Sequence, residues 1–145
     1  MLSQKAKYAL RAVLLLAERE GEMMLVADIA GRQKVPRKFL ELILLELKKH
    51  GLLHSQRGKH GGYVLAHPAA EVTFGQVIRV ADGPIAPLPC ASPTGYRRCA
   101  DCPDEATCAI RRVMREVRDA TAAVLDRTTF ADALSGAGAL AAAAD

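Results

Sequence analysis

The sequence predicts a mainly α protein with a small β wing, built as a winged helix-turn-helix domain followed by a long C-terminal helix. Three observations support this fold class. Apolar residues recur at three- and four-residue steps in three successive segments, two strand patterns around a glycine-rich turn follow them, and a further apolar seam repeats near the C-terminus. Three helices followed by a hairpin is the order of elements in a winged helix-turn-helix.

Capping and turn residues delimit the first three predicted helices. Ser3 can cap a helix that ends near Gly21. A short helix is expected over residues 26–33. Pro36 suits the first turn of a third helix, which runs to Gly51. The apolar faces of these helices predict one shared core.

A β-hairpin and a fourth helix follow. Residues 52–56 and 63–66 are expected to form its two strands. The turn between them contains Gly58, Gly61 and Gly62. Thr73 and Gln76 have the spacing of a capping box, which predicts a short helix over residues 74–82.

The remaining sequence divides into a linker, a long helix and a tail. Prolines in the linker prevent regular structure there. The helix after it, about twenty residues long, carries an apolar seam of Ile110, Val113, Met114, Val117, Ala120 and Val124. We therefore expect a DNA-binding domain over residues 1–82, a cysteine loop over 83–108, a dimerisation helix and short terminal helix over 109–134, and a frayed tail over 135–145.

Composition narrows the possible classes of function. Half of the 145 residues are apolar, so the chain can bury a core, but no apolar run reaches the length of about eighteen residues that predicts a membrane span. We expect a soluble, cytoplasmic protein without membrane contact. Residues 1–68 hold 12 Lys and Arg against 6 Asp and Glu, whereas residues 69–145 hold 8 against 10. The basic N-terminal half is therefore the candidate for binding a polyanion.

The third helix and the wing are the predicted contacts to double-stranded DNA. Arg or Lys at the start of a recognition helix can pair with guanine, and Glu can accept from cytosine. Phe39 fits either the core or a thymine methyl group. Basic side chains of the wing suit phosphate or the minor groove. The candidate residues are Arg37, Lys38, Phe39, Glu41, Arg57, Gly58, Lys59, His60 and Tyr63.

The seam of the long helix predicts a homodimer. An amphipathic helix after the main domain has little of its own chain left to cover it, so its apolar face is expected to meet a second copy. The alternative is that the helix packs back on the DNA-binding domain. A dimer would read two half-sites of a near-palindromic operator.

Three segments resemble the Rrf2 family of bacterial transcription regulators: SQKAKYALRA, VPRKFLELILLELKKHGLL and the wing QRGKHGGYVLA. The resemblance extends over residues 1–134. It implies a homodimeric winged-helix repressor or dual regulator, which is not an enzyme. It also implies that the long helix forms the dimer and that the cysteine loop holds a two-iron, two-sulfur (2Fe-2S) cluster.

All four cysteines lie within nineteen residues, at Cys90, Cys99, Cys102 and Cys108. Cys102 and Cys108 match a Cys-x5-Cys pair of the family, whereas Cys90 and Cys99 compete for its first cysteine. Cluster-binding relatives have a ligand histidine where this chain has Arg111, and nitric-oxide-sensing relatives have an acidic ligand where it has Lys7. The simplest way to supply the missing cluster ligand is ligation by all four cysteines.

Several states of this loop remain open from sequence. A 2Fe-2S cluster, a zinc ion, or a metal-free thiol switch using oxidation or persulfide formation would each suit clustered thiols. A small metal-binding or electron-carrying module is a rival from another class, but such a module needs no basic wing. Cysteine catalysis is disfavoured, because no histidine lies close in sequence to a cysteine.

Overall fold

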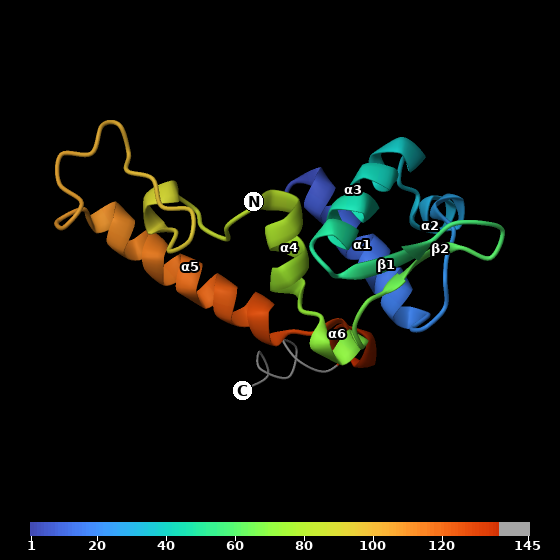
Figure 1. The fold of residues 1–145 in the computed structure, drawn as a ribbon. Coiled ribbons are helices and arrows are strands. Elements are labelled where there is room, and N and C mark those ends of the chain that lie inside the picture. Colours follow the sequence, from blue (N-terminus) through green and yellow to red (C-terminus); the bar gives the residue numbers. More distant parts are fainter. Residues whose placement is uncertain (137–145) are drawn as a thin grey trace.

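The computed structural model describes residues 1–136, and the predicted fold class is confirmed: the chain is mainly helical with one small antiparallel sheet (Figure 1). The predicted tail lies outside the described residues from 137 onward, while Ser135 still belongs to a helix. The elements are α1 (Gln4–Glu18), α2 (Val26–Gln33), α3 (Arg37–Lys49), β1 (Leu53–Gln56), β2 (Gly62–Leu65), a 3-10 turn η1 (Ala69–Glu71), α4 (Phe74–Asp82), a second 3-10 turn η2 (Pro89–Ala91), α5 (Ala109–Arg127) and α6 (Phe130–Ser135).

Helix α1 lies at the centre of the domain and packs on α2, α3, α4, α6 and β2. The predicted cap is present, because Ser3 Oγ accepts from the Ala6 amide at 3.0 Å. The Ser3 amide also donates to Asp82 Oδ2 at 2.9 Å, which ties the start of α1 to the end of α4. Helix α1 ends at Glu18 rather than near Gly21, because the chain turns over residues 19–21 and Gly21 adopts φ +85°.

The turn between α2 and α3 determines the direction of the third helix. Lys34 ends α2 in the left-handed conformation (φ +54°), and Pro36 is the N-cap of α3, one position before its predicted place in the first turn. The buried face of α3 consists of Leu40, Ile43, Leu44 and Leu47. Since that face rests on the core, the opposite face and the N-terminal end of α3 are exposed to solvent.

The hairpin has the predicted arrangement, but β1 begins one residue later than predicted and β2 begins and ends one residue earlier. Its register pairs Leu53 with Leu65 and Gln56 with Gly62. A third segment joins the sheet edge, because Met24 and Tyr63 exchange backbone hydrogen bonds of 2.9 and 2.8 Å. The base of the wing is therefore fixed to the segment that precedes α2, a long-range pairing that the sequence pattern did not predict.

The end of α5 returns to the N-terminal core. Thr73 and Gln76 form the predicted capping box of α4. Backbone hydrogen bonds then join Phe74 to Thr128 (3.1 Å) and Phe130 to Val72 (2.9 Å). Phe130 is fully buried and its ring stacks on Phe74 with centroids 4.4 Å apart. The short helix α6 is thus a structural part of the core around α1, η1 and α4.

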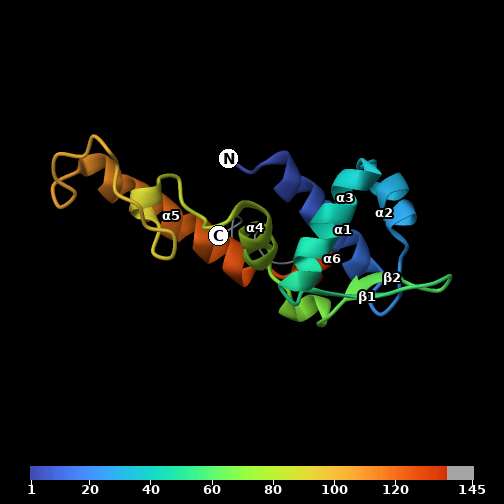
Figure 2. The same cartoon turned by 45° about the horizontal axis from the view of Figure 1, so that its top comes forward.

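The two ends of the molecule carry different features. The tip of the wing projects from one end, while the cysteine loop and the N-terminal half of α5 extend from the other end (Figures 1 and 2). Helix α5 connects these ends, since its C-terminus returns to the core beside α4. In residues 1–136, no helix is both long enough and apolar enough to cross a membrane.

Candidate nucleic-acid interface and cysteine loop

The N-terminal end of α3 presents charged side chains to solvent. Arg37, Lys38 and Glu41 are all exposed. Arg37 Nε lies 3.2 Å from Glu41 Oε1, one helical turn away, with the two side chains 65% and 48% exposed. Such an exposed pair stabilises a protein by only about 0.2–1 kcal/mol. The Arg37 side chain can therefore leave Glu41 at small cost in free energy.

Phe39 and Tyr63, two further predicted contacts, are partly buried against the core. Phe39 is half-buried against the core and meets Tyr8 edge to face, with ring centroids 5.7 Å apart and planes at 78°. Of its two predicted roles, the structure therefore places Phe39 in packing. Burial and the negative charge of Glu41 raise the pKa of Tyr63 above its ordinary 10.0. Tyr63 belongs to β2 at the base of the wing and is also half-buried against the core.

The wing tip carries the other predicted contacts. Arg57, Gly58, Lys59 and His60 are exposed, and the tip projects from the end of the molecule at which α3 begins (Figures 1 and 2). Two of the wing glycines make close approaches to the protein's own backbone. A Cβ on Gly61 would lie 2.0 Å from the Gln56 carbonyl oxygen. The tight turn of the wing therefore requires glycine there.

Gly62 makes the second close approach. Its φ is +127°, and an added Cβ would lie 2.1 Å from the Met24 carbonyl oxygen. Gly58 has φ +105° with no atom within 4 Å of an added Cβ. Gly58 is therefore the wing glycine with open space around it, at the exposed tip.

The cysteine loop is anchored to α5 through Cys90. This residue is part of η2 and is only 5% exposed. Arg111 Nε, on the first turn of α5, donates to the Cys90 carbonyl oxygen at 3.0 Å. Cluster-binding relatives have a ligand histidine at this position. In this chain Arg111 instead makes a hydrogen bond to the backbone of Cys90.

Cys90 and Cys99 are neighbours in space. Their Sγ atoms lie 3.9 Å apart, and both thiols are free. The hydrogen bond from Cys99 to Cys90 is the main cause of a raised Cys99 pKa, to which the like charge of a Cys90 thiolate adds. Eight residues lie between these two cysteines in the sequence, so the fold rather than local spacing brings them together.

The other two cysteines have different surroundings. Cys108 is the N-cap of α5, and its Sγ accepts from the Arg111 amide at 3.4 Å. The Cys102 amide donates to the Cys99 carbonyl oxygen at 3.3 Å. Among residues 1–136, no group of three or more His, Cys, Asp or Glu side chains is placed to hold a metal ion. As arranged, the four cysteines do not fit the shared ligation of a cluster or a zinc ion.

Polar contacts within the loop define its conformation. Arg98 donates to the Cys102 carbonyl oxygen at 3.2 Å, and the Tyr96 hydroxyl donates to Glu105. Asp104 Oδ1 accepts from the Ala106 amide at 3.0 Å, and the Gly95 amide donates to Ser92 Oγ at 2.8 Å. Hydrogen bonds among the loop's own residues therefore hold this conformation.

Helix α5 exposes most of its predicted apolar seam. Ile110 is 65% exposed, Val113 49%, Val117 44% and Val124 38%. Ala122 is instead the residue of α5 that is buried against the rest of the chain. A large apolar face therefore remains uncovered in a single copy, which is typical of a protein–protein contact.

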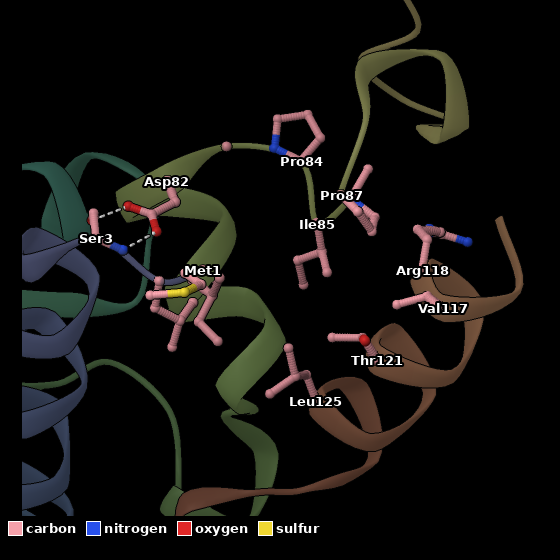
Figure 3. Close-up of a pocket in the computed structure, with 14 residues that line it drawn as sticks. Met1, Ser3, Asp82, Pro84, Ile85, Pro87, Val117, Arg118, Thr121 and Leu125 are labelled. Atoms are coloured by element: carbon pink, nitrogen blue, oxygen red, sulfur yellow. Dashed lines mark hydrogen bonds between the residues drawn. The ribbon is translucent and has the colours of Figure 1, made fainter. Parts of the chain in front are cut away.

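A cleft of about 760 Å³ continues this face toward the core. Met1 and Ser3, the end of α4, the linker through Pro87 and four residues of α5 surround it (Figure 3). Ile85 and Leu125 point into it, and Val117 belongs both to the cleft and to the exposed seam (Figure 3). The uncovered surface is thus a groove and a helix face together.

Comparisons with known proteins agree with these features. The family model described as "Rrf2: Iron-dependent Transcriptional regulator" matches residues 2–136. An rrf2-like protein of Rhodobacter capsulatus, named for helix-turn-helix transcriptional regulation, is 43% identical over 139 residues, which are 93% of each chain. Two solved structures are also similar: the global cysteine regulator CymR of B. subtilis (33% identity, TM-score 0.77, 93% of this chain and 96% of the other) and IscR of T. potens (28% identity, TM-score 0.74, 94% and 87%).

The matched region covers both the winged helix and the cysteine loop with its helix. Regulators of this family bind DNA and are not enzymes, which agrees with the exposed basic residues of α3 and the wing. The rival interpretation as an electron-carrying module is therefore wrong. The chain belongs to the Rrf2 family of DNA-binding transcriptional regulators.

Proposed function

We propose that two copies of this chain bind a near-palindromic DNA operator, and that the state of the cysteine loop sets the affinity. The observation that carries the proposal is the placement of three surfaces on one chain. The recognition helix and wing occupy one end, the cysteine loop occupies the other, and the uncovered face of α5 lies between them (Figure 1). The cytoplasm, where the operator is found, is the proposed location.

The DNA side of the proposal assigns two kinds of contact. Arg37, Lys38 and Glu41 are proposed to meet base edges in the major groove, because the first turn of α3 is their common position. Arg57 and Lys59 are proposed to contact phosphate or the minor groove from the wing. Gly58, which lies between them, and His60, which follows Lys59, belong to the same proposed contact surface. Phe39 and Tyr63, which pack against the core, are proposed to support these residues rather than to contact DNA directly.

The dimer side follows from the exposed seam. Burial of one valine or isoleucine side chain stabilises an interface by about 1.5–3 kcal/mol before the costs of association. A two-fold contact would bury each exposed residue twice, once per copy. The cleft beside Val117 extends this surface, so the partner's α5 is its proposed occupant.

The sensing side is proposed to use thiol chemistry. The observed arrangement does not fit four-cysteine ligation, whereas a close thiol pair is present. The loop contacts the first turn of α5 through Arg111, so a change in the loop can alter the helix that joins the two copies. A ligand or modification shifts DNA affinity only if it favours one of two states.

The word "iron-dependent" in the family description supports a second candidate, in which the loop rearranges to bind a 2Fe-2S cluster. Purification without oxygen, followed by a visible absorption spectrum and assays of iron and sulfide, tests this candidate. Two irons and two sulfides per chain would establish it, and their absence from freshly prepared protein would exclude it.

Sedimentation and DNA titration test the main proposal together. We expect a dimer in solution and an affinity for operator DNA that falls with salt. Val117→Glu places a charge in the proposed interface and should give a monomer with weakened operator binding. Glu116→Gln, an exposed change at the neighbouring position, is the matched control and should remain dimeric. A wild-type monomer that binds the operator with full affinity would contradict the proposal.

A further inference from the structure

We propose that Cys90 and Cys99 are a redox pair that forms an intramolecular disulfide, whereas Cys102 and Cys108 remain thiols. This inference rests on the proposed function and assigns its signal to two particular sulfur atoms. It differs from the sequence prediction, which treated all four cysteines as one set.

The geometry favours this pair. The two Sγ atoms are 3.9 Å apart, and a disulfide bond requires about 2.0 Å, so closure needs a movement of about 2 Å. Cys90 is held by η2 and by the hydrogen bond from Arg111. Cys99 lies in a segment without helix or strand, where the backbone can make this movement. The required change is therefore confined to the loop side of the pair.

The other cysteines have competing contacts. The Cys108 thiol accepts from the Arg111 amide at the start of α5, so its Sγ faces the helix terminus. Cys102 is joined to Cys99 through backbone atoms, and Arg98 holds the Cys102 carbonyl oxygen. A bond from Cys108 to Cys90 would break the contact of its Sγ atom with the Arg111 amide, whereas the Cys90–Cys99 bond leaves that contact in place.

The difference in exposure gives the order of events. Cys90 is buried, while Cys99 is half-buried and meets solvent first. The Cys99 thiolate attacks a low-molecular-weight disulfide, which releases one small thiol and leaves a mixed disulfide on Cys99. The Cys90 thiolate then attacks Cys99 Sγ and expels the second small thiol. The protein loses two protons and two electrons, and the small disulfide gains them as two thiols.

The disulfide would act on α5 through a short path. It would hold the segment between Cys90 and Cys99 against η2, and η2 contacts α5 directly. Arg111 in this contact neighbours Ile110, and Val113 is two positions further along the uncovered face of α5. A change in the redox state of the pair can therefore alter the position of the α5 face that is proposed to join two copies.

Disulfide mapping tests the inference on the full chain. Reduced protein is treated with oxidised glutathione, free thiols are blocked with iodoacetamide, and peptides are identified by mass spectrometry. We expect a Cys90–Cys99 cross-link with Cys102 and Cys108 alkylated, and a change of at least about fivefold in operator affinity. Cys102→Ser should retain both results, and Cys99→Ser should lose both.

Two outcomes would overturn the inference: a cross-link that uses Cys102 or Cys108, or no intramolecular disulfide. Mapping of the wild-type chain needs no variant, so a misfolded variant cannot obscure the result. A parallel sample in guanidinium chloride should lose the preference for this pair, which shows that the fold selects it. Operator binding by the reduced protein is measured separately, and its absence would contradict the proposed function rather than the pairing of the thiols.

Discussion

Arg79 and Asp126 join α4 to the end of α5 through a two-armed ion pair. Arg79 Nη1 lies 2.5 Å from Asp126 Oδ1, and Arg79 Nη2 lies 2.9 Å from Asp126 Oδ2. Gly75 allows this contact, because a Cβ there would lie 2.1 Å from Asp126 Oδ1. The pair holds the base of the long helix against the domain that carries the DNA-binding surface.

Acid should weaken this contact. The hydrogen bond from Arg79 lowers the Asp126 pKa below its ordinary 3.8. The stabilisation is therefore present above pH 3.8 and is lost as the pH falls through the lower folded-state value. Since the Asp126 side chain is 47% exposed, we expect an effect below about 1 kcal/mol. Urea unfolding between pH 6 and pH 2 measures it.

Asp126→Asn should reduce the loss of stability between pH 6 and pH 2, because the ion pair that acid would break is already absent. Asp119→Asn, a change of an exposed carboxylate on the same helix, is the control. An unchanged acid limb in Asp126→Asn would show that other carboxylates control it.

The wing glycines should differ in their tolerance of alanine. Gly62→Ala should destabilise the protein by about 2 kcal/mol or more, because a positive φ is combined with a collision against the Met24 carbonyl. Gly58→Ala shares the positive φ but meets open space, so about 1 kcal/mol is expected. Urea midpoints of the two variants measure the difference. Equal losses would show that the Met24–Tyr63 pairing does not constrain the wing.

Phe130→Ala should destabilise the domain by about 3–5 kcal/mol, because a fully buried ring in contact with Phe74 is removed. Leu134→Ala, on the same short helix but 40% exposed, should cost much less. Thermal unfolding of both variants measures the contrast. A small loss at Phe130 would mean that α6 is dispensable for the N-terminal core.

Lys59→Ala should weaken binding to DNA of any sequence and reduce the salt dependence by about one ion per chain, as expected when one phosphate contact is lost. Lys48→Ala is the control, since this exposed residue in the last turn of α3 interacts favourably with the helix dipole. Fluorescence anisotropy across a series of salt concentrations separates the two. Identical slopes for both variants would argue against a phosphate contact from the wing.

Local signals predicted most of the fold. The caps at Ser3 and Thr73 each satisfy a backbone donor within the first helical turn, so the sequence marks these helix starts directly. The burial of Phe130 and the pairing of Met24 with Tyr63 depend on residues far apart in sequence. No local periodicity contains that information.

The candidate site was also predictable only where local sequence signals determine it. Exposure of Arg37 and Lys38 follows from their place at the start of an amphipathic helix. The pairing of Cys90 with Cys99 does not follow from spacing, because the connecting loop has no regular structure and hydrogen bonds such as the one between Arg98 and Cys102 determine its path. The glycines of the wing are evident in the sequence, but their contacts with the protein's own backbone depend on the three-dimensional fold.

Selection of DNA from a random duplex library tests the central claim, that a dimer reads two half-sites. Two recognition helices related by a two-fold axis should enrich an inverted repeat with half-site centres about 10–10.5 base pairs apart, or a multiple of that spacing. Wild-type protein should retain this repeat, and Val117→Glu should fail to select it. Enrichment of a single unrepeated half-site by wild-type protein would contradict the account.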